Sequence, residues 1–136
     1  MKTYVFDAAA LFVLLENMAS APRVNEIIKE AAKGHCRILM STVNYGEVYG
    51  LLLRRYSEGS ALPVMSAVGR LPLELSDVTP QRGLRAAELK SKYKLYYADS
   101  FAAALAIENK ATLVTSDSDF RKLDHSFPIL WLKSGI

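Results

Sequence analysis

The chain of 136 residues lacks several features that would place it in a familiar class of protein. Its one cysteine, Cys36, cannot form an internal disulfide, so we expect a reducing, cytoplasmic location. No apolar run approaches the roughly 18 residues of a membrane span, so no membrane association is expected. The apolar N-terminal stretch is interrupted by Asp7 and no small-residue cleavage site follows it, so we expect no signal peptide.

The motifs of several enzyme classes are also missing. The sequence has no glycine-rich P-loop, no GxSxG nucleophile motif and no Cys/His pattern with zinc-ligand spacing. Internal repeats, low-complexity tracts and long linkers are absent as well. With 51% hydrophobic and 23% charged residues, the composition is that of an ordinary globular protein. The length suits one domain with a proper core, and we expect residues 1–136 to form it.

Short apolar segments alternate with helical ones along the chain. Strands are predicted for residues 2–6, 37–41, 72–76, 111–116 and 128–132. Helices are predicted for residues 8–18, 21–34, 41–56, 62–69, 80–93, 99–110 and 117–123. This alternation indicates βαβ units and therefore an α/β fold, with a parallel sheet covered by helices on both faces.

Acidic residues recur where the predicted strands end. Asp7 ends the first strand, Asp117 and Asp119 follow the fourth, Asp99 opens the helix at 99–110, and Glu47 lies in the first turns of the helix at 41–56. Parallel strands end at one edge of their sheet, where ligands bind, so we expect these five carboxylates to gather. Helix capping is the alternative for Asp7, Asp99 and Asp117, because Asp is a preferred N-cap residue.

The stretch NYGEVYG, Asn44–Gly50, does not fit the capping alternative. Glu47 lies beyond the first turn of its helix, between apolar residues, and a glycine inside a helix costs roughly 1 kcal/mol relative to alanine. We expect Gly46 and Gly50 to admit a neighbouring backbone, so that the Glu47 carboxylate reaches a shared centre. Ordinary helix–helix packing is the other explanation for the two glycines.

Four or five converging carboxylates would repel one another unless a cation held them. Sites rich in oxygen suit Mg²⁺ or Mn²⁺, and such an ion promotes attack on a phosphodiester. The chain has 17 basic and 14 acidic residues, and removing these five acids from the count leaves nine. A basic shell around an acidic pocket would suit a polyanionic substrate. A scattered, solvated charge distribution is the alternative.

Four motifs carry a resemblance to a known family: VFDAAAL, STVNYGEV, YYADSFAAALA and LVTSDSDF. In order and spacing they resemble the acidic motifs of the PIN domain, and more narrowly the small PIN ribonucleases that are toxins of VapBC toxin–antitoxin pairs. The resemblance covers essentially the whole chain and implies one PIN domain, residues 1–136. It implies a three-layer α/β/α sandwich with a central, mostly parallel sheet of four to five strands. It also implies Mg²⁺- or Mn²⁺-dependent RNA endonuclease activity, a homodimer, and a small VapB-like antitoxin that covers the site and binds DNA.

Within this resemblance, Asp7, Glu47, Asp99 and Asp117 match the family's acidic quartet. They are the expected catalytic residues and metal ligands, with Asp7 and Asp99 as the foremost ligands. Glu47 and Asp117 would complete the shell, directly or through water, and orient or deprotonate the attacking water. Asp119 matches a less constant acid that would serve a second metal or cap a helix.

The sequence departs from the family pattern directly after the first acid. Many relatives carry Ser or Thr there, whereas Ala8–Ala10 follow Asp7 in this chain. A hydroxyl that would orient Asp7 is therefore missing, which puts the catalytic rate in doubt more than metal binding. Thr115 and Ser116 fit the hydroxyl-bearing stretch before the fourth acid. The departure motivates an alternative function, a catalytically weak PIN-like domain that binds RNA or a protein partner without cutting.

Basic residues beside aromatic ones are candidates for RNA contacts. The candidates are Arg54, Arg55, Lys92 and Lys94, the last two among Tyr93, Tyr96 and Tyr97. Cations for phosphates beside rings for stacking would suit single-stranded RNA. The alternative is a solvated helix face with tyrosines in the core, where Trp131 is also expected.

A phosphoacceptor receiver domain shares the length, the class and the acids at the carboxyl edge. Receivers need an acidic pair after the first strand and an acceptor Asp at the end of the third. Here Asp7 stands alone and Asp77 lies beyond its strand, so the receiver alternative fits poorly.

Overall fold

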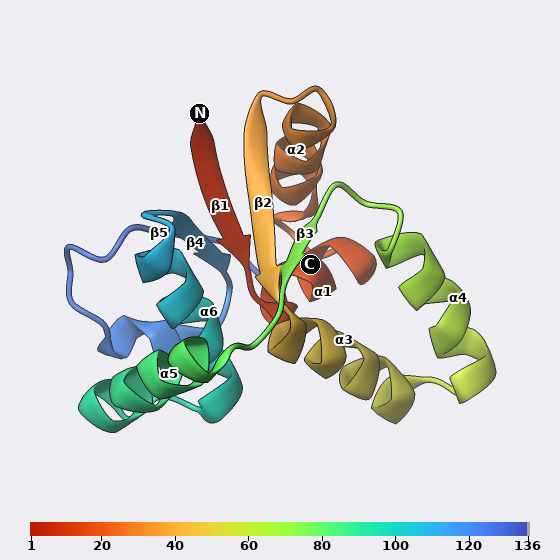
Figure 1. Ribbon diagram of the computed structural model, residues 1–136. Helices are drawn as coiled ribbons and strands as arrows, with labels where there is room; N and C mark the ends of the chain where they lie inside the picture. The colour runs from red at the N-terminus through yellow and green to blue at the C-terminus, as the bar shows by residue number, and fades with distance from the viewer. Residues whose placement is uncertain (136) are drawn as a thin grey trace.

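A computed structural model describes residues 1–135, and at its centre lies a sheet of five parallel strands (Figure 1). Its strands are β1 (Lys2–Phe6), β2 (Cys36–Ser41), β3 (Glu74–Ser76), β4 (Thr112–Thr115) and β5 (Ile129–Trp131). They are arranged in the order β3-β2-β1-β4-β5, with parallel pairing between all neighbours. The five predicted strands are all present, each within about two residues of its predicted bounds.

Helices cover both faces of this sheet (Figure 1). One layer holds α1 (Ala8–Leu15), α2 (Ala21–Ala32), α3 (Thr42–Arg55) and α4 (Glu58–Val68). The opposite layer holds α5 (Pro80–Tyr93), α6 (Tyr97–Glu108) and the 3₁₀-helix η1 (Ser118–Lys122). The predicted three-layer α/β/α sandwich is therefore confirmed. Within residues 1–135, none of the helices combines the length and the apolar character that crossing a bilayer requires.

The two hydrophobic cores follow from the alternation of side chains along the central strands. Val5 and Leu113 enter the core under α5 and α6, whereas their neighbours Phe6 and Val114 enter the core under α1–α4. Because both faces are covered, these strands read as continuous apolar runs rather than as alternating ones. The alanine-rich α6 is buried along most of its length, as its composition predicts.

Side-chain caps explain where several helices begin. Ser41 accepts a hydrogen bond from the backbone of Val43 at the start of α3, and Thr79 accepts one from Arg82 at the start of α5. Helix α4 begins at Glu58, four residues before the predicted start at Leu62, because Ser57 caps it. Pro63 therefore lies inside the helix and not in its first turn.

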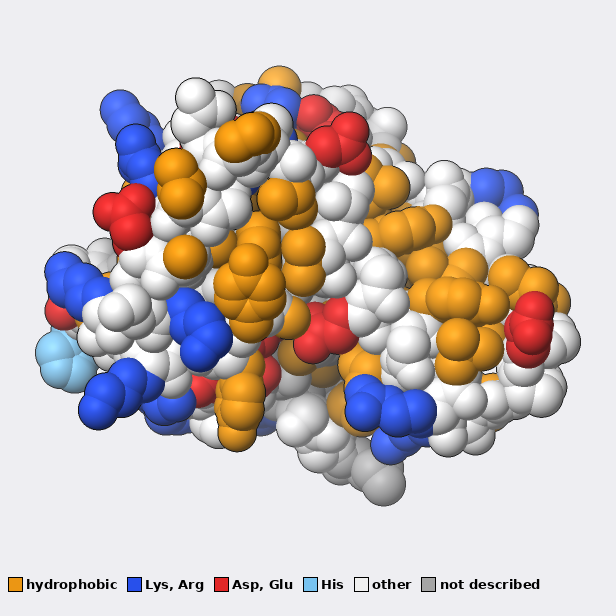
Figure 2. Space-filling view, turned by 60° about the horizontal axis from the view of Figure 1, so that its bottom comes forward, with side chains coloured by type: hydrophobic (Ala, Val, Ile, Leu, Met, Phe, Trp, Pro, Cys, Tyr) orange, Lys and Arg blue, Asp and Glu red, His pale blue; other side chains and the backbone are white. Residues whose placement is uncertain are grey.

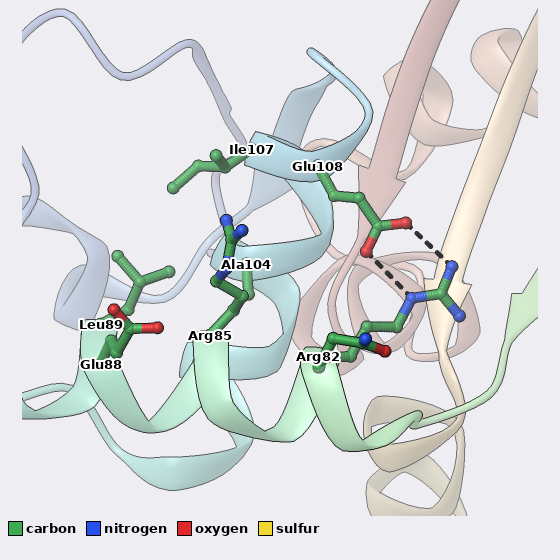
Figure 3. Close-up of a pocket in the computed structure, with 8 residues that line it drawn as sticks. Arg82, Arg85, Glu88, Leu89, Ala104, Ile107 and Glu108 are labelled. Atoms are coloured by element: carbon green, nitrogen blue, oxygen red, sulfur yellow. Dashed lines mark hydrogen bonds and ion pairs between the residues drawn. The ribbon is translucent and has the colours of Figure 1, made fainter.

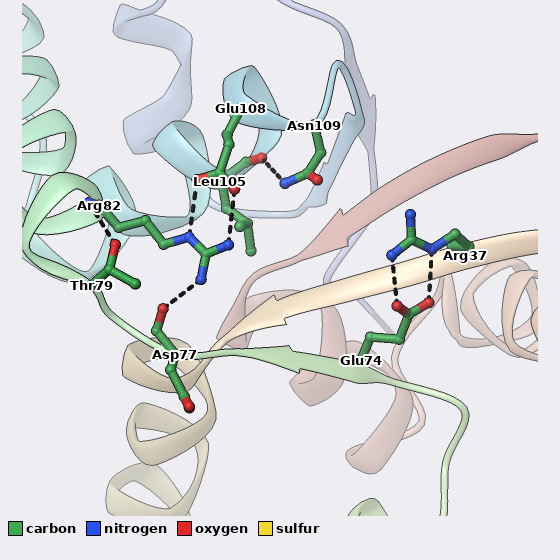
Figure 4. A network of polar contacts seen from close by, with 8 residues as sticks. All are labelled: Arg37, Glu74, Asp77, Thr79, Arg82, Leu105, Glu108 and Asn109. Atoms are coloured by element: carbon green, nitrogen blue, oxygen red, sulfur yellow. Dashed lines mark hydrogen bonds and ion pairs between the residues drawn. The ribbon is translucent and has the colours of Figure 1, made fainter.

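Two bidentate ion pairs tie the outer elements to the sheet and to each other (Figure 4). Arg37 on β2 donates to Glu74 on the edge strand β3 at 2.9 and 2.7 Å. Arg82 on α5 donates to Glu108 at the end of α6 at 3.0 and 2.9 Å, and to the carbonyl of Asp77 at 2.7 Å. Exposed pairs of this kind contribute about 0–1 kcal/mol each. They fix the path of the long crossover from β3 to α6.

The strand order places a topological switch between β1 and β4. The connections from β1 to β2 and from β2 to β3 run through α1–α4 on one face, whereas those from β3 to β4 and from β4 to β5 run through α5, α6 and η1 on the other. In open α/β sheets, ligands bind beyond the carboxyl ends of the strands at such a point. The ends of β1 and β4 carry Asp7 and Asp117, so the topology alone directs attention to them.

Candidate active site

Four of the five predicted acids line one pocket, of about 240 Å³, at the carboxyl edge of the sheet. They come from four separate segments of the chain: Asp7, Glu47, Asp99 and Asp117. None of the described residues that line this pocket is a Lys, Arg or His. Figure 2 shows this side of the molecule, with acidic side chains near the middle of the face and basic ones around them. The arrangement is a concentrated negative charge without a cationic partner in its walls.

Asp7 has two roles in the structure, because it caps a helix and also lines the pocket. Its Oδ1 accepts a hydrogen bond from the backbone of Ala10 at 2.9 Å, as expected of the N-cap of α1. Its Oδ2 accepts a hydrogen bond from the Thr115 hydroxyl at 2.5 Å, and the same hydroxyl oxygen accepts one from the backbone N–H of Asp117 at 2.9 Å. For Asp7, capping and convergence are therefore compatible rather than alternatives.

The hydroxyl bond from Thr115 changes the meaning of the alanines at 8–10. The sequence suggested that no hydroxyl would orient Asp7, but β4 supplies one from the other end of the chain. An Asp side chain held by two hydrogen bonds on its two oxygens has a fixed orientation toward the pocket. The doubt that Ala8–Ala10 cast on Asp7 is therefore removed by the geometry.

Burial and mutual repulsion weaken the acidity of three groups in the pocket. Burial raises the pKa of Asp7 to about 7, with a further contribution from the charges of Asp117 and Glu47, against the opposing hydrogen bonds from Thr115 and Ala10. Burial likewise raises the pKa of Glu47, and the nearby charge of Asp117 adds to this effect. Carboxyl groups this close to one another repel when they are ionised, which raises their pKa values. A bound cation would offset that repulsion.

Glu47 is held in place from the side of α3. The side-chain amide of Asn44 donates to Glu47 Oε1 at 3.3 Å and to the carbonyl of Ala98 at 3.1 Å. Asn44 is fully buried, and its bond to the carbonyl of Ala98 links α3 to the first turn of α6. Glu47 and Asp99, which follow these linked positions, both line the acidic pocket.

The two glycines beside Glu47 have a different explanation from the predicted one. A Cβ added to Gly46 or to Gly50 would meet no neighbouring atom within 4 Å, so neither glycine admits a close backbone. Both face open space on α3, and the prediction of close approach was wrong, as was its alternative of helix–helix packing. Glu47 reaches the pocket because α3 begins at the carboxyl end of β2, which points its first turns toward the site.

Asp99 and Asp119 form a coupled pair at the start of α6. Asp99 is the third residue of the helix, is 6% exposed and caps no helix. Burial, a hydrogen bond with Asp119 and the surrounding carboxylates raise its pKa well above the usual range. Burial alone would also raise the pKa of Asp119, but hydrogen bonds from Lys122, Asp99 and the backbone of Tyr96 lower it. The pKa values of the two carboxyl groups are therefore shifted in opposite directions, upward for Asp99 and downward for Asp119.

Asp119 does not line the pocket, and its two oxygens have other partners. Oδ2 accepts a hydrogen bond from the backbone N–H of Tyr96 at 3.0 Å, which ties η1 to the residue directly before α6. Oδ1 forms an ion pair with Lys122 at 2.6 Å. Asp119 is thus neither the N-cap residue of α6 nor that of η1, and its carboxylate is hydrogen-bonded to that of Asp99.

The donor set of the pocket fits a hard divalent cation. Its donors are carboxylate and hydroxyl oxygens, which Mg²⁺ and Mn²⁺ prefer, and no basic side chain competes for them. Within residues 1–135, no three His, Cys, Asp or Glu side chains lie close enough together to hold an ion by themselves. Mg²⁺ usually retains several waters and takes only one or two carboxylates, so a hydrated ion is what this spacing suits.

The predicted RNA-contacting residues lie at the ends of two helices, and none of them lines the pocket. Arg54 and Arg55 end α3, where Arg55 pairs with Glu16 at 2.9 Å. The charge of Arg54 acts on Glu47 and opposes the rise in its pKa. Lys92 and Lys94 are exposed at the end of α5, and Lys94 is the left-handed C-cap residue of that helix.

Tyr93 packs against a hydrophobic core, as one alternative expected, whereas Tyr96, Tyr97 and Trp131 do not take the core positions expected for them. Tyr96 and Tyr97 are exposed at the start of α6, and Trp131 is exposed at the end of β5. The expectation of a core position for Trp131 was wrong because β5 is an edge strand and its last residue projects beyond the helices. Arg121 and Lys122, next to these rings, were not identified from the sequence. The three-residue spacing of Asp119 and Lys122 is the sequence signal that could have identified Lys122.

A larger pocket, of about 620 Å³, lies between α5 and α6 on the outer surface (Figure 3). Arg82, Arg85, Glu88 and Glu108 line it together with Leu89, Ala104 and Ile107. Its strongest charges already satisfy each other, because Arg82 and Glu108 form a bidentate pair. Its two arginines and two glutamates balance in charge, unlike the side chains of the acidic pocket.

Comparison with known proteins agrees with this geometry. The sequence model of the PIN domain family matches residues 4–126. Among curated proteins, none matches the chain significantly. The fold is similar to that of VapBC2 from Rickettsia felis, bound to a DNA fragment from their promoter, with a TM-score of 0.70, 16% identity and coverage of 94% of this chain and 97% of that one.

Two further solved structures have the same fold. DNA-bound VapBC from Salmonella typhimurium gives a TM-score of 0.73 at 13% identity, over 96% of this chain and 98% of that chain. The sarcin-ricin loop cleaving toxin VapC20 from Mycobacterium tuberculosis gives 0.69 at 17% identity, over 87% and 92% of the two chains. At these identities the likeness establishes a shared fold.

Proposed function

Because the chain belongs to the PIN domain family, we propose that it is a divalent-metal-dependent RNA endonuclease and the toxin of a VapBC-type toxin–antitoxin pair. The observation that carries the proposal is the convergence of Asp7, Glu47, Asp99 and Asp117 on one pocket without a basic side chain in its walls. Folding gains nothing from crowding these carboxylates together, whereas phosphodiester hydrolysis with a metal requires it.

In this proposal, Asp7 and Asp99 hold Mg²⁺ or Mn²⁺, with Glu47 and Asp117 completing the shell directly or through water. The bound cation would offset the carboxylate charges and stabilise the charge that develops on the phosphate. Asp119, through its contacts with Tyr96 and Lys122, positions the start of α6 and thus Asp99. Thr115 fixes Asp7 in the orientation that faces the pocket.

The protein's own groups account for the movement of the proton. Glu47 or Asp117 accepts a proton from the attacking water, whose oxygen bonds to phosphorus as the bond to the leaving sugar oxygen breaks. The leaving oxygen takes up a proton from solvent. Because burial raises the pKa of Glu47, its carboxylate is a stronger base than that of a free glutamate.

RNA would reach the pocket across basic residues at its rim. Of the four predicted residues at the ends of α3 and α5, Arg54, Lys92 and Lys94 are our candidates for phosphate contacts, whereas Arg55 is already paired with Glu16. The solved structures with this fold include complexes of toxin with antitoxin, which supports a VapB-like antitoxin as the protein partner. A homodimer of the 15.1 kDa chain is part of the same proposal, and light scattering of the purified protein tests it.

The decisive experiment compares wild type with Asp99→Asn on a mixed RNA substrate, with Mn²⁺ and with EDTA. We expect cleavage only by the wild type with Mn²⁺. Asp77→Asn is the matched control, because Asp77 is exposed and lies outside the pocket, and it should cleave as the wild type does. Equal activity of Asp99→Asn and wild type would refute the nuclease.

The alternative of RNA or protein binding without cleavage has weaker support, because Thr115 supplies the hydroxyl whose absence motivated it. RNA binding without any metal-stimulated turnover would select that alternative. The toxin proposal has a separate test, since expression of the wild type should arrest bacterial growth and expression of Asp99→Asn should not. A short neighbouring gene for a DNA-binding protein would supply the antitoxin.

A further inference from the structure

Two pairs of a cation and an aromatic ring meet at η1. The ammonium group of Lys122 lies 5.7 Å from the centre of the Tyr96 ring, and the guanidinium of Arg121 lies 4.7 Å from that of Trp131. The rings come from two different elements, because Tyr96 is the N-cap residue of α6 and Trp131 ends β5. We call these four residues, Tyr96, Arg121, Lys122 and Trp131, the aromatic strip.

Three links along the backbone connect the aromatic strip to residues of the acidic pocket. Asp117, which lines the pocket, is the N-cap residue of η1. The backbone of Tyr96 bonds to Asp119, the partner of Asp99. Trp131 is paired in the sheet with Thr115, which bonds to Asp7. A strand of RNA with its scissile phosphate at the pocket would therefore pass next to the strip.

The rings of Tyr96 and Trp131 are exposed and do not contribute to a hydrophobic core of the described residues. Tyr96 is 73% exposed and Trp131 is 38% exposed. Within residues 1–135, neither the Tyr96 hydroxyl nor the indole N–H of Trp131 makes a hydrogen bond to another group of the chain. Two large exposed rings beside a candidate active site point to a ligand with flat faces.

The two cations of the strip differ in their partners among the described residues: Lys122 is held by an acidic residue, whereas Arg121 is not. Lys122 is fixed by Asp119 at 2.6 Å and by the carbonyl of Lys94 at 2.9 Å, which holds the ammonium group beside Tyr96. Arg121 makes no ion pair with an acidic side chain in the described part of the chain. Its guanidinium is therefore free to bind a phosphate while its plane lies against the indole.

We propose that the aromatic strip binds unpaired nucleotides of the RNA that flank the scissile phosphate, with bases stacked on Tyr96 and Trp131, a phosphate contacted by Arg121, and Lys122 holding the Tyr96 ring in place. The inference rests on the proposed nuclease and specifies its substrate as single-stranded at the site. Bases stack on protein rings only when they are free of their own helix, so a continuous duplex cannot use the strip.

Trp131 is the only tryptophan in the sequence, so its fluorescence reports on the strip directly. In EDTA, where no turnover occurs, titration of the full-length protein with a short oligouridylate should quench this fluorescence to saturation. A fully paired RNA duplex at the same concentration should leave it unchanged. The absence of quenching by the oligouridylate would overturn the proposal.

Variants test each ring separately by fluorescence anisotropy of a labelled oligouridylate. Tyr96→Ala and Trp131→Ala should each raise the dissociation constant about tenfold, the usual effect of losing one stacked base. Trp131→Phe should retain most of the affinity, because it keeps a ring. Leu84→Ala is the matched control, since Leu84 is 67% exposed on α5 and outside the strip, and its affinity should equal that of the wild type.

Cleavage by the same variants separates this inference from the proposed function. With Mn²⁺, Tyr96→Ala should raise KM about tenfold and leave kcat largely unchanged, because the ring does not touch the reacting atoms. RNA cleavage by the wild type together with unchanged affinities in both ring variants would overturn the strip and leave the nuclease standing. The strip would then be open to a protein partner. Quenching and weakened variants without any wild-type cleavage would support the strip and remove the nuclease.

Discussion

The hydroxyl of Thr115 donates a hydrogen bond to Oδ2 of Asp7, although 108 positions separate the two residues in the sequence. The same hydroxyl oxygen accepts the backbone N–H of Asp117. One small side chain at the end of β4 thus connects two carboxylates of the candidate site at the switch between β1 and β4. It performs the orienting role that the residue after Asp7, an alanine, cannot perform.

Replacing this hydroxyl should affect both stability and catalysis. Thr115→Val keeps the shape but leaves Asp7 and the amide of Asp117 without their partner, which should lower the free energy of unfolding by about 1–3 kcal/mol. Metal-dependent cleavage should fall roughly 10- to 100-fold, as is usual when a residue that orients a ligand is lost. Urea denaturation and RNA cleavage measure the two effects.

Thr115→Ser is the matched control, because it removes a buried methyl group and keeps the hydroxyl. It should lose about 1 kcal/mol of stability and retain cleavage near the wild-type rate. If the serine and valine variants cleave equally well, the hydroxyl does not orient Asp7 for catalysis.

The stability of the metal-free protein should decrease as pH rises. The pKa of Asp7 is raised to about 7 in the fold, and the pKa values of Glu47 and Asp99 are raised as well. The folded state therefore binds more protons than the unfolded chain above about pH 4. Stability from these groups is fully present below their unfolded pKa and is lost as pH rises through the folded value. We expect Tm in EDTA to fall between about pH 5 and about pH 8.

Mn²⁺ should reverse this trend, because it binds the ionised carboxylates. The rise in Tm on adding Mn²⁺ should be larger near pH 8 than near pH 5. Asp7→Asn should flatten the pH dependence in EDTA, since an asparagine still caps α1 but does not titrate. A metal-free Tm that rises over this pH range would contradict the buried, protonated state of the pocket.

Gly46 and Gly50 should be replaceable by alanine with a gain in stability. Both lie inside α3 with open space around them, and alanine is favoured over glycine in a helix by about 0.5–1 kcal/mol. We expect the double variant to shift the urea midpoint upward. A loss of stability in either single variant would show that the conformation of α3 in solution brings another group against that position.

The sequence predicted those parts of the protein that depend on local patterns. Short apolar runs bounded by helices defined the sheet, and Asp7 and Asp117 were placed at its edge because each directly follows a strand. Glu47 was placed at the site because it lies in the first turns of the helix after the second strand, and only the role given to the glycines beside it was wrong, since they face solvent. Because α3 begins directly after β2, its first turns lie at the carboxyl edge of the sheet, and this alone brings Glu47 to the site.

Contacts between distant segments could not be predicted in this way. The bond from Thr115 to Asp7 joins β4 to β1, and the ion pair of Asp119 with Lys122 draws a carboxylate away from the pocket. The exposure of Trp131 depends on β5 being an edge strand, and no local pattern gives the order of strands in a sheet. These details decide which residues can hold a cation and which ones face a substrate.

Arg54 and Arg55 are neighbours in sequence but should behave differently toward RNA. Arg55 is paired with Glu16 at 2.9 Å, and Glu16 also accepts a bond from Tyr56, so its charge is already matched. Arg54 has no ion pair in residues 1–135 and acts on Glu47 at the pocket. Arg54→Ala should weaken binding of single-stranded RNA and reduce the slope of log affinity against log salt by about 0.7.

Arg55→Ala serves as the comparison, because it removes the same charge from the adjacent position. It should leave the salt slope unchanged and lower the free energy of unfolding by less than about 1 kcal/mol, as expected for an exposed pair. Binding measured in EDTA over a series of salt concentrations gives both slopes. Equal slopes for the two variants would mean that the affinity for RNA depends only on the total charge at the end of α3. A change confined to Arg54→Ala would place a phosphate next to Glu47, on the α3 side of the pocket.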